Sequence, residues 1–442
     1  MKLFRVLAVL AFLLGLLPAI AAAQGGSIVI AEDIAVATSA GDERLDAIGY
    51  NSLRGEFLIV WEVDTGGGDT DVWARRATLR PGFTWLGNPF AIASTSAPEK
   101  NAAIAFNPTT DEDFLVVFER HFSETDVDVV GQRVAGRAGG GDNGGELKGS
   151  SISIGVSVGR ETHPAVDFLP ATQNFLVVYE MDGDIAARRV SRAGFGDNGG
   201  DLIGDAFLIA ADFLREESSP AVIASTQQSY FLVTYTYDFA DGDKDIRGQR
   251  VKGLSSIGNE LLGGAFDIAS TPDEESASRI GYVPKQQAFL VVWQSEAVGN
   301  SDVMAVWLDE RDLDDNPLIG STFAVSDDLV ALEKMPYVDA DPAGGEVLVA
   351  LAFAPSAETT QRLGLVWVKP DPHALNHISR SLYLFPEQSY SYAFPRLSMC
   401  HAKPGVLLGY SALAGSGADG PYNARLIATQ RSSLALPLVL RD

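Results

Sequence analysis

The stretch Phe289-Leu-Val-Val-Trp293 decides how this chain folds, because near-copies of it recur along the whole sequence. The clear copies occupy residues 57–61, 114–118, 175–179, 231–235 and 289–293, and weaker copies occupy 347–351 and 406–410. Successive copies start 56 to 61 residues apart. Self-similarity at such a period is typical of solenoids and propellers, in which each repeat is one structural unit.

Each copy is apolar at nearly every position, as expected of a strand whose two faces are both covered. Three further strand-like runs accompany it in each repeat, for example Ala165-Val-Asp-Phe168 before the copy, then Asp245-Ile-Arg-Gly-Gln-Arg-Val251 and Phe266-Asp-Ile-Ala269 after it. Turn residues separate these runs, and no helical periodicity is present. We therefore predict an all-β, seven-bladed β-propeller with four-stranded antiparallel blades.

The two ends of the repeat region predict a closed ring. The last repeat lacks the Phe-x-Ile-Ala strand that ends the others, whereas a similar strand, Ile34-Ala-Val-Ala37, precedes the first repeat. Pairing this strand with the third strand of the last repeat, near Asn423-Ala-Arg-Leu-Ile427, would remove exposed sheet edges. We expect the N-terminal strand to complete the last blade.

The N-terminus has the pattern of a cleaved secretory signal. Lys2 and Arg5 precede an apolar run, and Ala21-Ala-Ala23 supplies a small-residue cleavage site. We expect a signal peptide at 1–23, a propeller at 24–430 and an apolar tail at 431–442, with the protein secreted or at the cell surface. The apolar run is too short for a stable span, and no other stretch is apolar enough for a transmembrane helix.

The chain is strongly acidic, with a formal net charge of −25 at pH 7. Such a charge argues against nucleic acid or anionic lipid as a partner, because both require a basic surface. We expect a monomer that binds a glycan or a protein at an acidic face.

Two sets of loops on one face of the predicted propeller carry carboxylates. One glutamate stands before the first strand of each of six repeats: Glu43, Glu99, Glu161, Glu217, Glu275 and Glu333. We predict a crown of carboxylates around one mouth of the central channel. The alternative is structural: a residue that repeats in every blade is usually one that every blade needs, for a turn, a cap on free backbone amides or a contact to the next blade.

A metal site is one reading of the hairpin Asp241-Gly-Asp243-Lys-Asp245, because three carboxylates at alternating positions can converge on Ca²⁺. The remaining features of an EF-hand loop are missing, since Ile246 and Lys252 occupy the positions of its Gly and Glu. The alternative is an ordinary acidic turn. We therefore name no cofactor beyond a possible Ca²⁺.

Three residues depart from the repeat and are candidates for ligand contact. His163 opens a first strand just before Pro164 and could face the channel mouth. Tyr390 and Tyr392 lie in a lengthened loop before the last repeat, where aromatic side chains could stack on a sugar or seal the ring.

The unit made of Phe-Leu-Val-Val-Trp, an acidic hairpin, Asp-Ile-x-Gly-Gln-Arg-Val and Phe-x-Ile-Ala resembles repeats of exported bacterial β-propeller proteins, many of them uncharacterised. The resemblance covers nearly the whole mature chain and implies the fold and an exported setting. It carries no catalytic residues that could be transferred to this sequence.

We therefore expect a non-catalytic binding or surface-interaction propeller whose ligand face is acidic. The alternative is a carbohydrate-active hydrolase or lyase that uses carboxylates at the channel mouth, because fold alone does not decide between binding and catalysis.

Overall fold

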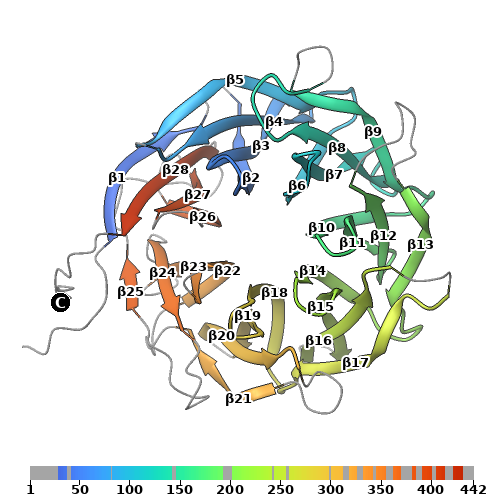
Figure 1. Cartoon of the computed structure of the whole chain (residues 1–442). Coiled ribbons are helices and arrows are strands. Elements are labelled where there is room, and N and C mark those ends of the chain that lie inside the picture. The colour runs from blue at the N-terminus through green and yellow to red at the C-terminus, as the bar shows by residue number, and fades with distance from the viewer. Residues whose placement is uncertain are drawn as a thin grey trace, which may run out of the picture.

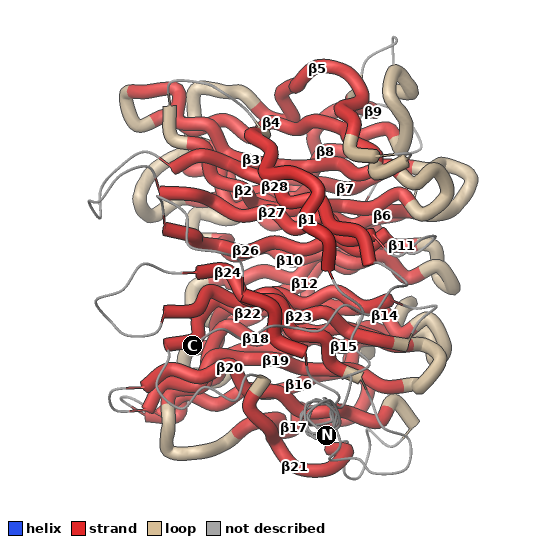
Figure 2. Tube along the Cα trace, turned by 90° about the vertical axis from the view of Figure 1, so that its left-hand side faces the viewer, coloured by secondary structure: helices blue, strands red, loops and turns tan. Residues whose placement is uncertain are grey.

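The computed structural model describes residues 28–36, 41–80, 82–141, 146–192, 202–240, 243–254, 258–297, 300–311, 318–325, 332–341, 345–354, 362–369, 381–384, 391–400, 405–413 and 422–431. These residues form strands arranged as a ring around a central axis (Figure 1). Throughout the described ranges the chain is strand or loop, with no helix long and apolar enough to span a membrane (Figure 2).

The strand bounds follow the repeat. They are β1 Ile28–Ala35, β2 Glu43–Asn51, β3 Glu56–Gly66, β4 Asp69–Thr78, β5 Thr84–Ala93, β6 Glu99–Asn107, β7 Asp113–His121, β8 Val127–Ala135, β9 Leu147–Gly155, β10 Glu161–Leu169, β11 Asn174–Met181, β12 Asp184–Ser191, β13 Leu202–Ala210, β14 Glu217–Ser225, β15 Tyr230–Ala240, β16 Asp243–Lys252, β17 Leu261–Ala269, β18 Glu274–Val283, β19 Ala288–Ala297, β20 Asn300–Asp309, β21 Leu318–Ala324, β22 Leu332–Asp341, β23 Glu346–Ala354, β24 Arg362–Val368, β25 Ser381–Leu384, β26 Ser391–Cys400, β27 Gly405–Leu413 and β28 Tyr422–Arg431.

The hydrogen-bonded sheets confirm a β-propeller but correct the predicted number of blades. Five blades are separate four-stranded sheets: β2–β5, β6–β9, β10–β13, β22–β25 and β1 with β26–β28. The strands β14–β21 form one eight-stranded sheet instead of two separate blades. The prediction of seven four-stranded blades is therefore wrong, and five separate blades are present beside the larger sheet.

A single parallel contact joins the two halves of the eight-stranded sheet, where Lys244 of β16 pairs with Glu274 of β18. The Lys244 ammonium also donates a hydrogen bond to the Glu274 carboxylate. β16 begins two residues earlier in the repeat than β12, and β18 begins one residue earlier than β14. At another junction, Val127 and Arg160 make a similar parallel bridge that lies outside the named strands and does not join two sheets.

The ring closes as the sequence predicts. Strand β1 pairs antiparallel with β28, and Ile34 lies opposite Leu426. In Figure 1 the first and last parts of the chain share one blade. The sheet therefore contains strands from both ends of the chain, and neither end leaves the last blade incomplete.

The repeated apolar stretch forms the second strand of each unit and is the centre of the core. Phe57, Phe175 and Phe289 are fully buried. Clusters of buried side chains span adjacent units; for example, Leu58 and Val60 of β3 belong to one cluster with Phe114 of β7. The sheets are thus held together by apolar packing on both faces, which explains why alternation is absent from these strands.

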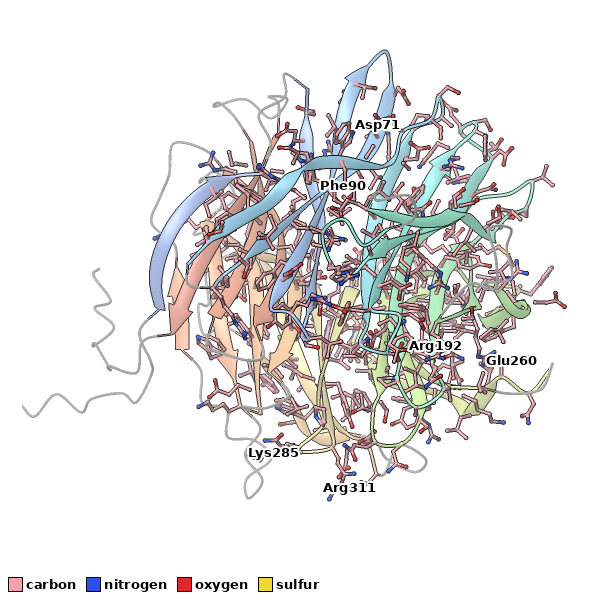
Figure 3. All side chains as sticks on the ribbon, turned by 45° about the horizontal axis from the view of Figure 1, so that its top comes forward. Asp71, Phe90, Arg192, Glu260, Lys285 and Arg311 are labelled. Carbon is pink, nitrogen blue, oxygen red and sulfur yellow. The ribbon has the colours of Figure 1, made fainter. Side chains whose placement is uncertain are left out.

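We call the end of the ring that carries the β3–β4-type hairpins and the connections between units the linker face. Hairpin and connection are joined there by backbone hydrogen bonds, for example from Asp64 N–H to Asp42 C=O (2.9 Å). At the opposite face, arginines of the third strands donate to the next unit: Arg189 Nη2 donates to Lys252 C=O (2.8 Å). Figure 3 shows Asp71 of the linker face apart from Arg192 and Arg311, which belong to the opposite face.

Candidate functional site

The innermost strands share a bulge that lies next to the central channel. In β6, β10, β14, β18 and β22 the pairing with the following strand shifts register at the same position, three or four residues into the strand. The first bulged residue has a left-handed backbone in each, with φ between 50° and 54°: Asn101, His163, Ser219, Ala277 and Met335. A bulge turns a side chain away from its regular direction, and functional sites use it for that purpose.

Side chains of the preceding unit hold four of these bulges in place. The backbone N–H groups of Asn101, His163 and Ser219 donate to Glu62 (2.6 Å), Glu119 (2.7 Å) and Glu180 (2.5 Å). Met335 N–H donates to the side-chain oxygen of Gln294 (3.1 Å). Each acceptor directly follows the repeated apolar stretch in sequence. Sequence reasoning missed this set, although its position after each copy was the available signal.

Four of the five bulges, those at Asn101, His163, Ser219 and Ala277, line a cavity of about 280 Å³ within the channel. Its polar lining comes from Asp46, Asn101, His163, Ser219 and Arg279, and Pro164, Pro220 and alanines supply apolar wall. This volume is just below the range of about 300–1,000 Å³ that is usual for small-molecule sites. The left-handed bulge repeats from unit to unit, whereas the residue type at the bulge does not.

His163 lies at the channel, where the sequence predicted it could lie. Its Nδ1 is 3.0 Å from Glu180 Oε2, and its side chain remains 58 % exposed. The hydrogen bond to Glu180 raises the pKa of His163 against the opposing effect of burial. Burial disfavours the charged form of Glu180, but hydrogen bonds from His163 and Ser219 outweigh it and hold the pKa of Glu180 below its usual value. The pair therefore favours a charged imidazolium at the cavity.

A pair of carboxyl groups also lies beside this cavity. Burial raises the pKa of Glu62, which also hydrogen-bonds Asp46. Asp46 Oδ2 also accepts the backbone N–H of Ala102 (3.2 Å).

The glutamates predicted to form an exposed crown are instead buried. Glu43, Glu99, Glu161, Glu217, Glu275 and Glu333 are each at most 2 % exposed. Several of them accept hydrogen bonds from the connection just before their own strand: Ser157 Oγ donates to Glu161 (2.6 Å), and Thr95 Oγ donates to Glu99 (2.5 Å). The amide-capping alternative therefore describes their contacts, and side chains buried in this way do not form a surface crown.

The proposed calcium hairpin is only partly described. Asp241 lies outside the described residues, whereas Asp243 and Asp245 lie at the start of β16. Asp245 is buried, and burial together with Asp243 and Asp267 raises its pKa. Across the described ranges, no three acidic, histidine or cysteine side chains come together in a way that could hold a metal ion.

The two tyrosines remain predictions. Tyr390 lies outside the described residues. Tyr392 lies in β26, and its backbone pairs with that of Ala412. The structure therefore places the backbone of Tyr392 on an innermost strand.

Comparison with known proteins supports the fold alone. No protein-family model matches the sequence, and the curated proteins contain no match. Among solved structures, the chain is similar to the β-propeller domain of Cps50 (Swd1) from Myceliophteria thermophila, with 12 % identity, a TM-score of 0.51 and coverage of 92 % of this chain and 100 % of that one. It is also similar to the phage phi92 endosialidase (9 % identity, TM-score 0.50, covering 94 % and 70 %) and to the Dos1 propeller (10 % identity, TM-score 0.48, covering 91 % and 95 %).

Proposed function

We propose that this protein is an exported, monomeric, non-catalytic propeller that binds a glycan at the channel cavity near its linker face. One observation carries the proposal: the bulges repeat, but the side chains that they present do not. A residue needed for folding should recur in each unit, whereas a binding site breaks the symmetry of a repeat. Export rests on the signal pattern at 1–23 and on the resemblance of the repeats.

The chemistry of the lining favours a hydroxylated ligand. Arg279 donates hydrogen bonds, and the Asn101 amide and the Ser219 hydroxyl can each both donate and accept them. Neighbouring hydroxyl groups of a sugar can satisfy such a mixed set, since each hydroxyl is both donor and acceptor. His163 adds a further, positively charged donor when protonated, which favours glycans that carry a carboxylate.

Binding is favoured over hydrolysis by the arrangement of the carboxylates. A glycosidase separates its two carboxyl groups by about 5–9.5 Å to place the sugar or a water between them. Asp46 and Glu62 instead contact each other, and both accept backbone N–H groups. Glu119 and Glu180 likewise accept bulge N–H groups, so these side chains act as supports of the cavity wall.

Calcium is retained only as a proposal for the 241–245 hairpin. Its support is the alternation of three aspartates in the sequence.

An array of defined neutral and acidic oligosaccharides tests the proposed function. The purified protein should bind a restricted class of glycans, and the variants Arg279→Ala and His163→Asn should weaken binding at least tenfold. Asn is chosen for position 163 because it tolerates a left-handed backbone and already occupies the matching position 101. Arg311→Ala, which removes an exposed arginine from the opposite face, is the matched control.

Equal binding by Arg279→Ala and Arg311→Ala would contradict the proposed site. Failure of the wild-type protein to retain any glycan on the array would contradict the ligand class. Release of a reducing sugar from a bound glycan would replace the binding assignment by the hydrolase alternative.

A further inference from the structure

Large apolar side chains are exposed together on one part of the linker face. They are Phe122, Val156, Val158, Phe213, Leu214 and Phe239. Phe213 is fully exposed, Val158 is 92 % exposed and Leu214 is 80 % exposed. They lie in the β7–β8 hairpin, the β9–β10 connection, the β13–β14 connection and the end of β15. The Asp182-Gly183 hairpin between β11 and β12 lies between the second and third of these and carries none of the six.

Backbone hydrogen bonds tie these loops into one continuous surface, which we call the apolar arc. Val127 N–H donates to Gly159 C=O (3.1 Å), and Asp182 N–H donates to Arg160 C=O (3.2 Å). The next two links run from Glu217 N–H to Gly183 C=O (2.7 Å) and from Asp238 N–H to Glu216 C=O (2.9 Å). Hairpins and connections therefore alternate without a break from the β7–β8 hairpin to β15.

The arc is an asymmetric feature of the ring. Among the described loops of the linker face, the first hairpin is Asp64-Thr-Gly-Gly-Gly-Asp69, and the connection before β6 is Ser94-Thr-Ser-Ala-Pro98. Neither contains a large apolar residue. Soluble proteins rarely gather exposed apolar side chains without a binding role, and folding does not require these residues, since other units do without them.

The loops that carry the apolar side chains also carry acidic residues. The acidic residues in these same loops and strand ends are Glu124, Asp126, Asp182, Asp184, Asp212, Glu216 and Asp238. Asp182, Asp184 and the segment 211–216 line a groove in which Phe213 and Leu214 also lie. The Arg215 guanidinium stacks 5.3 Å from the ring of Phe239, so this cation is directed at the arc's own aromatic ring.

We propose that the apolar arc is a docking site for a protein partner whose contact surface combines apolar side chains with lysines or arginines. The apolar residues would supply the buried centre of the interface, and the carboxylates a complementary rim. A second copy of this acidic chain would place carboxylates against carboxylates, and an anionic membrane would be repelled. This inference goes beyond the glycan site, because its residues do not line the channel cavity.

A designed peptide probe tests the arc on the full-length mature protein. The probe is a labelled amphipathic peptide of Lys and Leu, compared with one in which Ser replaces Leu and one in which Glu replaces Lys. Fluorescence anisotropy at physiological salt should show binding of the Lys/Leu peptide only. The double variant Phe213→Ser/Leu214→Ser should weaken that binding at least tenfold.

The matched control is Leu53→Ser/Leu254→Ser, which removes two exposed leucines from the loops of the opposite face. It should bind the Lys/Leu peptide as the wild type does. Equal loss in both double variants, or equal binding of the Lys/Ser peptide, would overturn the proposal, because only unspecific attraction would remain. Two further outcomes would also overturn the proposal, if the Phe213→Ser/Leu214→Ser variant abolishes them. A wild-type dimer in sedimentation would indicate that a second copy of the chain covers the arc, and co-sedimentation with zwitterionic vesicles would indicate that a membrane does.

Glycan binding should be unchanged in the Phe213→Ser/Leu214→Ser variant. The peptide assay and the glycan array therefore fail independently, so each proposal is refuted by its own measurement.

Discussion

Replacing Glu119 by Ala should destabilise the fold through the bulge at His163. The carboxylate is 2 % exposed and accepts three hydrogen bonds, from His163 N–H (2.7 Å), Asn101 Nδ2 (2.8 Å) and His121 Nε2 (2.8 Å). Leaving a buried donor without a partner costs about 1–3 kcal/mol, and a hydrogen bond to a charged group is worth about 1.5–3 kcal/mol. We expect Glu119→Ala to lower the free energy of unfolding by about 2–4 kcal/mol.

Equilibrium denaturation in urea, followed by tryptophan fluorescence, measures this loss as a shift in midpoint at constant slope. Glu119→Gln retains an acceptor oxygen for His163 N–H and should lose about 1 kcal/mol. Glu124→Ala removes the same charge from an exposed position on the neighbouring hairpin and should change stability by less than about 0.5 kcal/mol. If Glu119→Ala behaves like Glu124→Ala, the bulge does not depend on this cap.

The pH dependence gives a second check on Glu119. Burial opposes ionisation, but the hydrogen bonds from His121 and His163 outweigh it and keep the pKa of Glu119 below its usual value. A carboxyl group with a lowered pKa in the folded state stabilises the protein above its unfolded pKa, about 4.3, and this contribution disappears as the pH falls through the folded value. The difference between wild type and Glu119→Ala should therefore shrink below about pH 4.

Three further outcomes are expected. Burial raises the pKa of Glu217 to about 7, so the proton that stabilises the folded state is lost as the pH rises from about 4.3 through 7. The free energy of unfolding of the wild type should fall over that range by at most about 3 kcal/mol. In denaturation at pH 5 and pH 8, Glu217→Gln should show a weaker dependence of stability on pH than the wild type. Gly409→Ala would place a methyl group 1.9 Å from Leu45 Cδ2 and should cost about 1–3 kcal/mol, whereas Gly264→Ala on β17, with open space around it, should cost less in the same assay. On the calcium proposal, millimolar Ca²⁺ should raise the thermal midpoint by several degrees above that in EDTA, because an ion that binds only the folded state stabilises it; an unchanged midpoint would refute calcium binding at the 241–245 hairpin.

The sequence predicts the parts of the fold that depend on apolar periodicity. Phe57–Trp61 and its copies are recognisable because strands covered on both faces need nearly continuous apolar residues. The pairing of β1 with β28 is also predictable, because a strand missing at one end reappears at the other. The joining of β16 to β18 cannot be predicted from the sequence, because it depends on whether the ends of the two strands meet. A single pair, Lys244 with Glu274, makes one sheet out of two.

The candidate site was harder to predict because a bulge leaves little trace in an apolar pattern. One trace does exist: Pro164, Pro220 and Pro336 each follow a left-handed residue, at a point where a missing N–H does no harm to the ladder. The Glu43 set was misplaced for a related reason. A charged residue next to a connection is read as exposed, but here the connection folds back and donates its own hydroxyl and amide groups to the carboxylate.

In this ring, the side chains that recur from repeat to repeat support the fold, whereas those that differ between repeats are candidates for ligand contact. Glutamates at the position of Glu99 and Glu161 recur in the repeats, and these two are buried and accept hydrogen bonds from the loops just before their own strands. Their recurrence is therefore explained by a structural role. The bulge backbone recurs too, but it presents Asn101 in one unit and His163 in the next, a difference that closure of the ring does not require. Because the bulge is kept in each of these units and only its side chain varies, the lining of the cavity can change without a change in the apolar core. The side chains at the bulges are therefore the residues to substitute first.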